Sequence, residues 1–241
     1  MAWHLIEGEA GCAYARRHGC VAVVVDALRA SATAAMLLNA GAAEILVVRE
    51  IEEALDARKH WGDALLFGER GGLPPEGFDF GNSPRDADAA KGRRVIFTTT
   101  TGAQRLVSAW GAAAVYMGST VNASAVRARA ATNGADVVLI PAGLATDSSF
   151  IAQEDWVAAA AIAAAAKAEI GEGRQRFDYW RDRIREEGIL RLFETAPHAQ
   201  KLRDVGLEED IAFCAQSNIT GAVPTAVAHT RIGVIVRDLH A

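Results

Sequence analysis

The sequence predicts an α/β protein whose mostly parallel sheet lies between helices on both faces. Short runs rich in Val and Ile lack strict apolar-polar alternation, which is typical of strands buried on both faces. Stretches with helical patterning separate these runs, and such alternation indicates parallel units with right-handed crossovers. We therefore expect a three-layer α/β/α arrangement, with a sheet that can divide into two lobes.

The clearest strand candidate is the all-apolar run 21–25. The following stretch, 31–39, is rich in Ala and Leu and ends at Asn39 and Gly41, which are common helix stop signals. Neither a repeat nor a Pro/Gly/Ser-rich linker divides the chain, so we expect one domain over 1–241 without an assignable internal boundary. Further strands are expected at 45–48, 64–67, 94–97, 113–117, 137–140 and 233–236, and further helices at 51–61, 103–110, 153–168 and 174–193.

Composition and charge exclude several classes of protein. The formal charge of -5 argues against a nucleic-acid-binding protein, which normally carries a basic surface. The richest apolar run, 157–166, has about half of the ~20 residues that span a bilayer, and Glu7 and Glu9 interrupt the start of the chain. Three cysteines without a CxxC spacing support neither a disulfide framework nor a zinc ribbon. We expect a cytoplasmic protein that binds neither nucleic acid nor membrane.

Asp26 directly follows the run 21–25 and precedes Arg29 and Ser31, at a predicted change from strand to helix. Open α/β sheets bind ligands at this edge, and the free N–H groups of a helix start attract anions. Asp26 can bind Mg2+ or attack phosphorus, and Arg29 can hold a phosphate, carboxylate or sulfonate through two hydrogen bonds. The alternative is that Asp26 or Ser31 only caps the helix.

A loop rich in Gly and Pro, 68–84, follows the strand predicted at 64–67. These residues constrain the backbone to turns and close approaches, yet the loop keeps three charged side chains. Glu69 and Asp79 are plausible oxygen ligands for Mg2+, and Arg70 is a plausible anion clamp. The alternative is a surface loop whose charges are solvated.

Hydroxyl and amide side chains follow two more predicted strands. Thr99 and Thr100 lie in a threonine-rich turn that can cradle a phosphate, although four threonines can also continue a strand. Ser119 and Asn122 can bind a ligand, but capping a helix is the better interpretation of these two alone. Glu154 opens the Ala-rich helix at 153–168, where the helix dipole alone can explain an acid.

The six histidines fall outside these motifs, which disfavours a Ser-His-Asp triad and zinc hydrolysis. What recurs instead is a strand followed by Asp, Glu, Thr, Ser, Asn, Arg or Gly. That inventory suits a Mg2+-assisted reaction on a small polyanion, in which the cation and Arg neutralise the charge of a phosphoryl group in transfer.

Taken together, the motifs resemble those of the 2-phosphosulfolactate phosphatase family, known for the dephosphorylation step of coenzyme M biosynthesis. The likeness covers most of the chain. It is carried by Val25-Asp26-Ala27-Leu28-Arg29-Ala30-Ser31-Ala32-Thr33, Gly68-Glu69-Arg70-Gly71-Gly72, Gly77-Phe78-Asp79-Phe80-Gly81-Asn82-Ser83-Pro84, Thr98-Thr99-Thr100, Gly118-Ser119 with Asn122, and Glu154-Asp155.

The resemblance implies a Mg2+-dependent phosphatase that converts (2R)-2-phospho-3-sulfolactate to 3-sulfolactate and phosphate. Such a small anionic substrate fits the several Arg and loop N–H sites. Our hypothesis for the individual roles divides the motif residues into three sets. Asp26, Glu69 and Asp79 bind Mg2+; Arg29, Arg70, Ser31, Thr99, Thr100, Ser119 and Asn122 contact the substrate; and Asp26 or Glu154 assists the attack on phosphorus.

Two alternatives remain open at this point. The chain can be a phosphatase for another small phosphorylated hydroxy acid, or a non-catalytic anion-binding protein that has kept the pocket. The resemblance leads us to expect Asn and Thr around the threonine-rich turn, where the chain has Thr101 and Ala103. A change of specificity follows if these positions touch the sulfonate or the carboxylate. We also expect a homodimer.

Overall fold

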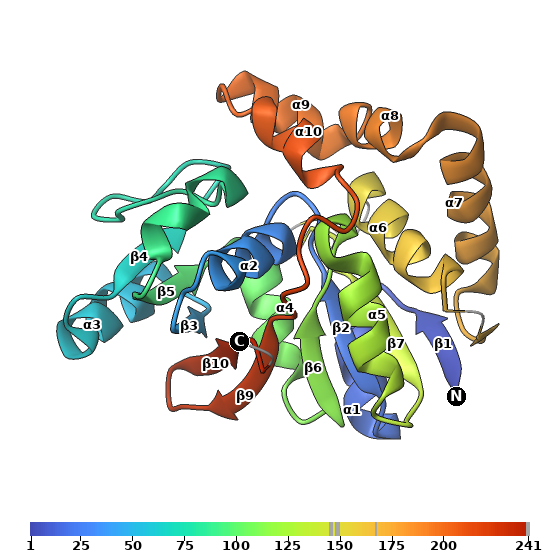
Figure 1. The fold of residues 1–241 in the computed structure, drawn as a ribbon, viewed down its shortest axis with the longest axis horizontal. Coiled ribbons are helices and arrows are strands. Elements are labelled where there is room, and N and C mark those ends of the chain that lie inside the picture. The colour runs from blue at the N-terminus through green and yellow to red at the C-terminus, as the bar shows by residue number, and fades with distance from the viewer. Residues whose placement is uncertain (145–146, 148–149, 167, 240–241) are drawn as a thin grey trace.

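The computed structural model describes residues 1–144, 147, 150–166 and 168–239. Its ten strands form one sheet in the order β4-β5-β3-β10-β9-β6-β2-β7-β1-β8 (Figure 1). The strands are β1 (Ala2–Leu5), β2 (Val21–Val25), β3 (Glu44–Val48), β4 (Leu65–Gly68), β5 (Arg94–Thr98), β6 (Ala114–Met117), β7 (Val137–Pro141), β8 (Glu169–Ile170), β9 (Thr225–His229) and β10 (Gly233–Arg237).

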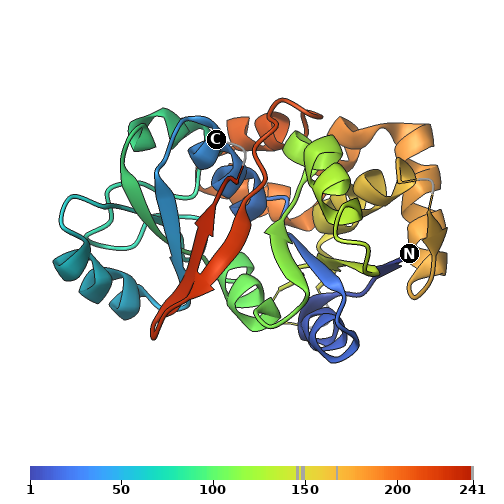
Figure 2. The same cartoon turned by 60° about the horizontal axis from the view of Figure 1, so that its bottom comes forward.

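The sheet is mostly parallel, as expected, and consists of two parallel groups. One group is β4, β5 and β3, and the other is β6, β2, β7, β1 and β8. The antiparallel hairpin of β9 and β10 lies between them, because β10 pairs with β3 and β9 pairs with β6 (Figure 2).

Helices cover both faces of this sheet, which confirms the predicted three-layer arrangement. In Figure 2, α1 and α4 lie below the sheet and α5 and α6 above it. The described helices are α1 (Gly8–His18), α2 (Ala30–Asn39), α3 (Ile51–Trp61), α4 (Gly102–Ala109), α5 (Ala123–Ala131), α6 (Gln153–Ala164), α7 (Arg174–Glu187), α8 (Ile189–Glu194), α9 (Pro197–Asp204) and α10 (Glu209–Cys214), with 3-10 turns η1 (Pro84–Ala90) and η2 (Thr120–Asn122).

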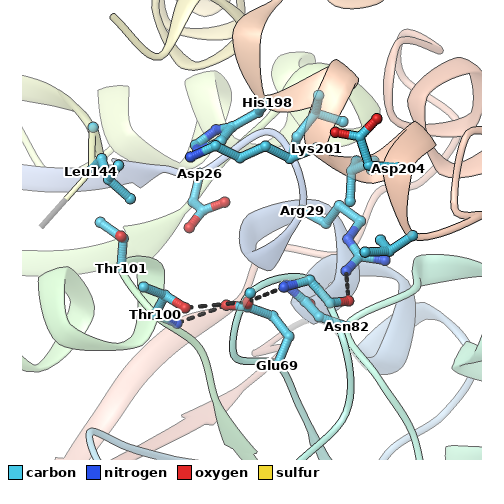
Figure 3. Close-up of a pocket in the computed structure, with 16 residues that line it drawn as sticks. Asp26, Arg29, Glu69, Asn82, Thr100, Thr101, Leu144, His198, Lys201 and Asp204 are labelled. Atoms are coloured by element: carbon cyan, nitrogen blue, oxygen red, sulfur yellow. Dashed lines mark hydrogen bonds between the residues drawn. The ribbon is translucent and has the colours of Figure 1, made fainter. Parts of the chain in front are cut away.

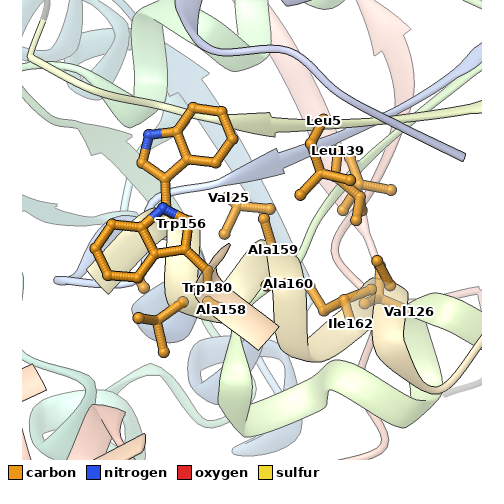
Figure 4. Close-up of a cluster of buried hydrophobic side chains, with 14 of the residues drawn as sticks. Leu5, Val25, Val126, Leu139, Trp156, Ala158, Ala159, Ala160, Ile162 and Trp180 are labelled. Carbon is orange, nitrogen blue, oxygen red and sulfur yellow. The ribbon is translucent and has the colours of Figure 1, made fainter. Parts of the chain in front are cut away.

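The central strand β2 shows why continuous apolar runs predicted buried strands. Val23 and Val25 pack into a cluster with α6, including Trp156 (Figure 4), whereas Val24 packs on the opposite face with α4, including Leu106. Because successive side chains of a strand point to opposite faces, only an uninterrupted apolar run satisfies both layers. Each fully buried Val contributes about 1.5–3 kcal/mol relative to an exposed one.

The structure corrects the predicted helices after residue 150. The Ala-rich helix ends at Ala164 rather than 168, and residue 167 of that prediction lies outside the described residues. The helix predicted at 174–193 is two helices, α7 and α8, separated by Gly188. Gly188 has a φ of 81°, a left-handed value that glycine adopts without steric cost, so helical periodicity on both sides did not imply one helix.

Helices α8, α9 and α10 lie across the top of Figure 1, above α2 and α6. We call these three helices the roof. The roof packs against the core and against the loop after β4. In that loop, Gly72 lies close to Val205, which follows α9 directly: a Cβ added at Gly72 would be 3.5 Å from the Val205 side chain. Within the described parts of the chain, no helix combines the length and hydrophobicity that crossing a membrane requires.

Candidate active site

A cavity of about 320 Å³ lies between the loops that follow β2, β4, β5 and β7 and the underside of the roof (Figure 3). The loop after β2 contributes Asp26, the loop after β4 contributes Glu69, and the turn after β5 contributes Thr100. Helix α9 contributes His198 and Lys201 from the roof. Carboxyl ends of parallel strands therefore form the floor, the edge at which α/β sheets bind ligands.

Asp26 is held in place by the start of α2. Its backbone N–H donates to Ser31 Oγ at 3.0 Å, and its Oδ1 accepts the N–H of Ala30 at 3.1 Å. The Ser31 hydroxyl in turn donates to Val24 O at 3.0 Å. The other oxygen, Oδ2, faces Gly102 at the start of α4, where an added Cβ would lie only 2.5 Å away. The fold thus fixes one carboxylate oxygen and leaves the other towards the cavity (Figure 3).

Glu69 connects the loops after β4 and β5. Its Oε1 accepts the N–H of Thr100 at 2.7 Å, and its Oε2 accepts the Thr100 hydroxyl at 3.2 Å and the N–H of Gly72 at 3.0 Å. Figure 3 shows this carboxylate below Asp26 and beside Asn82. Asn82 lines the cavity with 3% of its surface exposed, and its Oδ1 has no hydrogen-bond partner among the described residues.

Two buried acids at the start of α6 lie behind the cavity. Glu154 Oε1 contacts His198 Nδ1, and Glu154 Oε2 has no partner within the described chain. Asp155 accepts the N–H of Ala27 at 2.7 Å and that of Gly143 at 3.2 Å, so it ties the loops after β2 and β7 to α6. Asp155 is therefore a positioning residue for Asp26.

Burial and the repulsion of neighbouring carboxylates raise the pKa values of Asp26 and Asp155. Burial raises the pKa of Asp26 to about 6; Glu69 and Glu154 add to the rise, while the N–H of Ala30 and His198 oppose it. Burial, with the charges of Glu154 and Asp26, also holds the pKa of Asp155 well above its usual range. Such a surplus of carboxylates around one cavity attracts cations and protons.

The same acids favour the charged form of His198. Burial by itself disfavours the charged imidazole, but the hydrogen bond with Glu154 and the charges of Glu154 and Asp26 raise the pKa of His198 above its usual value. His198 also lies against the Phe150 ring, with ring centroids 4.6 Å apart. The arrangement places a proton-carrying group above Asp26.

A family model described as 2-phosphosulpholactate phosphatase matches residues 11–229. The chain belongs to this family. Proteins named "Probable 2-phosphosulfolactate phosphatase" are similar along most of the chain. The protein of Carboxydothermus hydrogenoformans is 39% identical over 84% of each chain. That of Deinococcus radiodurans is 37% identical over 86% of this chain and 88% of its own, and that of Gloeobacter violaceus is 34% identical over 90% and 92%.

In this member of the 2-phosphosulpholactate phosphatase family, Arg29 lines the cavity but is already paired. Its Nη1 donates to Asp210 at 2.6 Å and its Nη2 donates to Gly72 O at 2.8 Å. Both side chains of the pair are buried. Arg29 therefore joins α2, the loop after β4 and α10 before it contacts any anion.

Arg70 and Asp79 do not line the cavity. Arg70 donates to two backbone carbonyls, those of Glu69 and Arg49, at 2.7 and 2.8 Å. Asp79 accepts the N–H of Leu66 at 2.8 Å and forms an ion pair with Arg58 at 3.0 Å. The structure thus separates Asp79 from Asp26 and Glu69, because Asp79 is bound to Arg58 of α3 and to the backbone of β4.

Of the five hydroxyl and amide residues predicted to contact substrate, only Thr100 lines the cavity. Thr99 Oγ1 accepts the N–H of Ala103, in the first turn of α4, at 3.0 Å. Asn122 Oδ1 accepts the N–H of Ser119 at 2.9 Å, and its Nδ2 donates to Ala222 O at 3.0 Å. The capping interpretation therefore describes Ser119 and Asn122. The strand that the threonines could have continued ends at Thr98. Thr101 lines the cavity, whereas Ala103 packs in the core.

The side chains of the roof were missed by sequence reasoning. His198, Lys201, Leu202 and Val205 all line the cavity. His198, Lys201 and Leu202 lie on one face of α9, because they are three and four residues apart, and Val205 follows the helix directly. That spacing is visible in the sequence, but it identifies only a face of a helix and not what lies below it.

The donor set fits a divalent cation held by few protein ligands. Among the residues that the structure describes, no three His, Cys, Asp or Glu side chains form a ready-made metal cluster. Mg2+ nevertheless keeps several waters and commonly takes one or two carboxylates together with substrate phosphate. Asp26 Oδ2 and the Glu69 carboxylate both border the cavity and meet this requirement.

Proposed function

We propose that this protein is a phosphatase that hydrolyses (2R)-2-phospho-3-sulfolactate to 3-sulfolactate and phosphate. One observation carries the proposal beyond family membership: Asp26 is fixed through Oδ1 and directs Oδ2 into a cavity bordered by the start of α4 and by His198. A carboxylate, a helix start and a proton donor around one small cavity are the groups that phosphate ester hydrolysis needs.

We further propose that Asp26 and Glu69 hold a Mg2+ ion. When bound, such an ion neutralises charge on the phosphoryl oxygens and orients them for attack. The raised pKa of Asp26 supports this assignment. Burial is the main cause of the rise and the charges of Glu69 and Glu154 add to it, and a bound cation offsets both costs of the charged carboxylate.

The phosphoryl group lies, in this proposal, between Asp26 and the turn of Thr100 and Thr101. The partial positive charge of the α4 start favours an anion there. The P–O bond to the sulfolactate carbon frame breaks, water supplies the new oxygen on phosphorus, and the leaving oxygen takes up a proton. His198 supplies that proton, and Glu154 acts through His198 as a positioning residue.

Phosphate release by the purified protein tests the activity. With Mg2+ present, we expect kcat/KM for phosphosulfolactate to exceed that for 2-phospholactate and 3-phosphoglycerate, because only the first carries a sulfonate. Equal values would favour a phosphatase for another phosphorylated hydroxy acid. Binding of sulfolactate without release of phosphate from any substrate would favour an anion-binding protein instead.

We also propose that the product enters coenzyme M biosynthesis, which is the pathway expected from the resemblance to the family. Phosphosulfolactate carries phosphate, carboxylate and sulfonate on three carbons, so hydrolysis yields a sulfonated hydroxy acid that a dehydrogenase can oxidise. The test is metabolic: deletion of the gene should cause phosphosulfolactate to accumulate in the cell. An unchanged pool would contradict this part of the proposal.

A further inference from the structure

The roof helix α9 presents a different chemistry to the cavity from that of the floor. The floor carries the carboxylates Asp26 and Glu69, whereas α9 carries Lys201 next to the apolar side chain Leu202, and Val205 follows the helix directly. Lys201 therefore brings a cation to the side of the cavity opposite these two acids, and Asp204 of the same helix also lines the cavity.

Two basic side chains around the cavity are already paired with acids. Arg29 pairs with Asp210 at 2.6 Å, and His198 contacts Glu154. Lys201 differs, since none of the ion pairs formed by the described residues includes it. Its ammonium instead lies 4.7 Å from the centre of the Phe150 ring, and its side chain extends over the cavity (Figure 3).

We propose that Lys201 determines specificity by binding the sulfonate of the substrate. The inference rests on the proposed phosphatase function and adds to it the group that distinguishes phosphosulfolactate from other phosphate esters. Helix α9 then binds the sulfonate end of the substrate, which does not react, while the floor binds the phosphate end, which does.

The charges of the two sides of the cavity determine whether the phosphoryl group or the sulfonate lies at the floor or at α9. The phosphoryl group must reach Asp26, where carboxylates repel an anion unless a cation accompanies it. The sulfonate takes no part in the reaction, so it lies at Lys201, whose ammonium forms no ion pair among the described residues. The nearby Asp204 of the same helix accepts a hydrogen bond from Gln200 Nε2 at 2.8 Å. A lysine ammonium offers three donors on a flexible stem, which suits the three equivalent oxygens of a sulfonate.

Two substrates and one variant test the assignment. In Lys201→Met, the stem and its apolar contacts are kept and the charge is lost. We expect KM for phosphosulfolactate to rise about tenfold or more with kcat changed less than about threefold, because binding to a remote group is lost equally from substrate and transition state. For 2-phospholactate, which has a methyl group in place of the sulfomethyl group, KM should change less than about twofold.

Arg203→Met is the matched control, because Arg203 lies on the same helix, donates to Glu194 O at 2.7 Å and does not line the cavity. This variant loses the same charge and should keep the wild-type KM for both substrates. Lys201→Arg should recover part of the discrimination. An equal loss on both substrates would overturn the inference by showing that Lys201 binds phosphate or supports the fold.

A binding measurement separates this inference from the function on which it rests. Calorimetry with sulfolactate and lactate needs no turnover, and Lys201→Met should weaken only the sulfolactate complex. Wild-type protein that releases no phosphate from phosphosulfolactate would refute the proposed function. Wild-type turnover combined with unchanged sulfolactate binding in Lys201→Met would refute the role of Lys201 alone.

Discussion

Arg29 and Asp210 form a buried ion pair, 2.6 Å from Nη1 to Oδ2, across 181 residues of sequence. Asp210 also accepts the Ser83 hydroxyl at 2.7 Å, and Arg29 also donates to Gly72 O. The pair thus links the start of α2 and the loop after β4 to the roof. It holds the two walls of the cavity at a fixed distance.

We predict that Asp210→Asn lowers the free energy of unfolding by about 3–5 kcal/mol, since it leaves the buried Arg29 charge without a counter-ion. Urea unfolding measures this change. Glu209→Gln is the control, because Glu209 pairs with Arg85 on the surface, where such a pair contributes about 0–1 kcal/mol. Equal stability of the two variants would show that the buried pair does not secure the roof.

The raised pKa of Asp26 predicts a gain in stability on neutralisation. Its pKa rises from 3.8 unfolded to about 6 folded, so the folded state keeps a proton that the unfolded state loses, and stability falls as the pH rises between these values. Above pH 6 the penalty is fully present. Asp26→Asn removes it and should stabilise the metal-free protein by about 1–3 kcal/mol at pH 8, with little change near pH 4.

Thermal unfolding with a chelator present, at both pH values, measures this effect, and phosphate release should be abolished in the same variant. Asp88→Asn, at an exposed position, should change neither property. A loss of stability at pH 8 would contradict the view that Asp26 is held charged against its environment.

The seven strands predicted from the sequence lie where they were expected, because each is an apolar run buried on both sides. Three strands were missed for a physical reason. β8 has only two residues, β1 mixes Trp3 and His4, and β9 is partly exposed, so none shows a run of Val and Ile. Their place in the sheet depends on neighbours and not on their own pattern.

From the sequence, only the part of the site formed by the loops after the strands could be predicted. Asp26, Glu69 and Thr100 follow strands directly, and the carboxyl ends of strands bring them together. Arg70 belongs to the same motif as Glu69, but its direction depends on the Arg49 carbonyl, which the local sequence does not indicate. The contribution of α9 depends on how a distant helix packs, and no local pattern encodes that.

The sequence predicted one metal site for Glu69 and Asp79. Because only Glu69 lines the cavity, we expect substitutions of these two residues to affect the Mg2+ requirement differently. Glu69→Gln should raise the Mg2+ concentration for half-maximal activity by about tenfold or more, as loss of a ligand or its support does. Asp79→Asn should leave that concentration unchanged, because Asp79 pairs with Arg58 away from the cavity. A Mg2+ titration of phosphate release compares them. Equal shifts would show that Asp79 does influence the metal site.

Gly102 is the position at which the smallest change should disturb the site most. A Cβ there would lie 2.5 Å from Asp26 Oδ2 and 2.7 Å from Ala30 Cβ, so either Asp26 or α4 must move. Intrinsic preference favours Ala over Gly in a helix by about 1 kcal/mol, and any loss therefore comes from these contacts. Since a displacement of about 1 Å can cost about 100-fold in rate, we predict that Gly102→Ala lowers kcat/KM by about that factor.

Gly221→Ala is the control, because its Cβ would meet no atom within 4 Å. Normal phosphate release by Gly102→Ala would show that the reaction does not require Asp26 Oδ2 in the place where α4 now confines it.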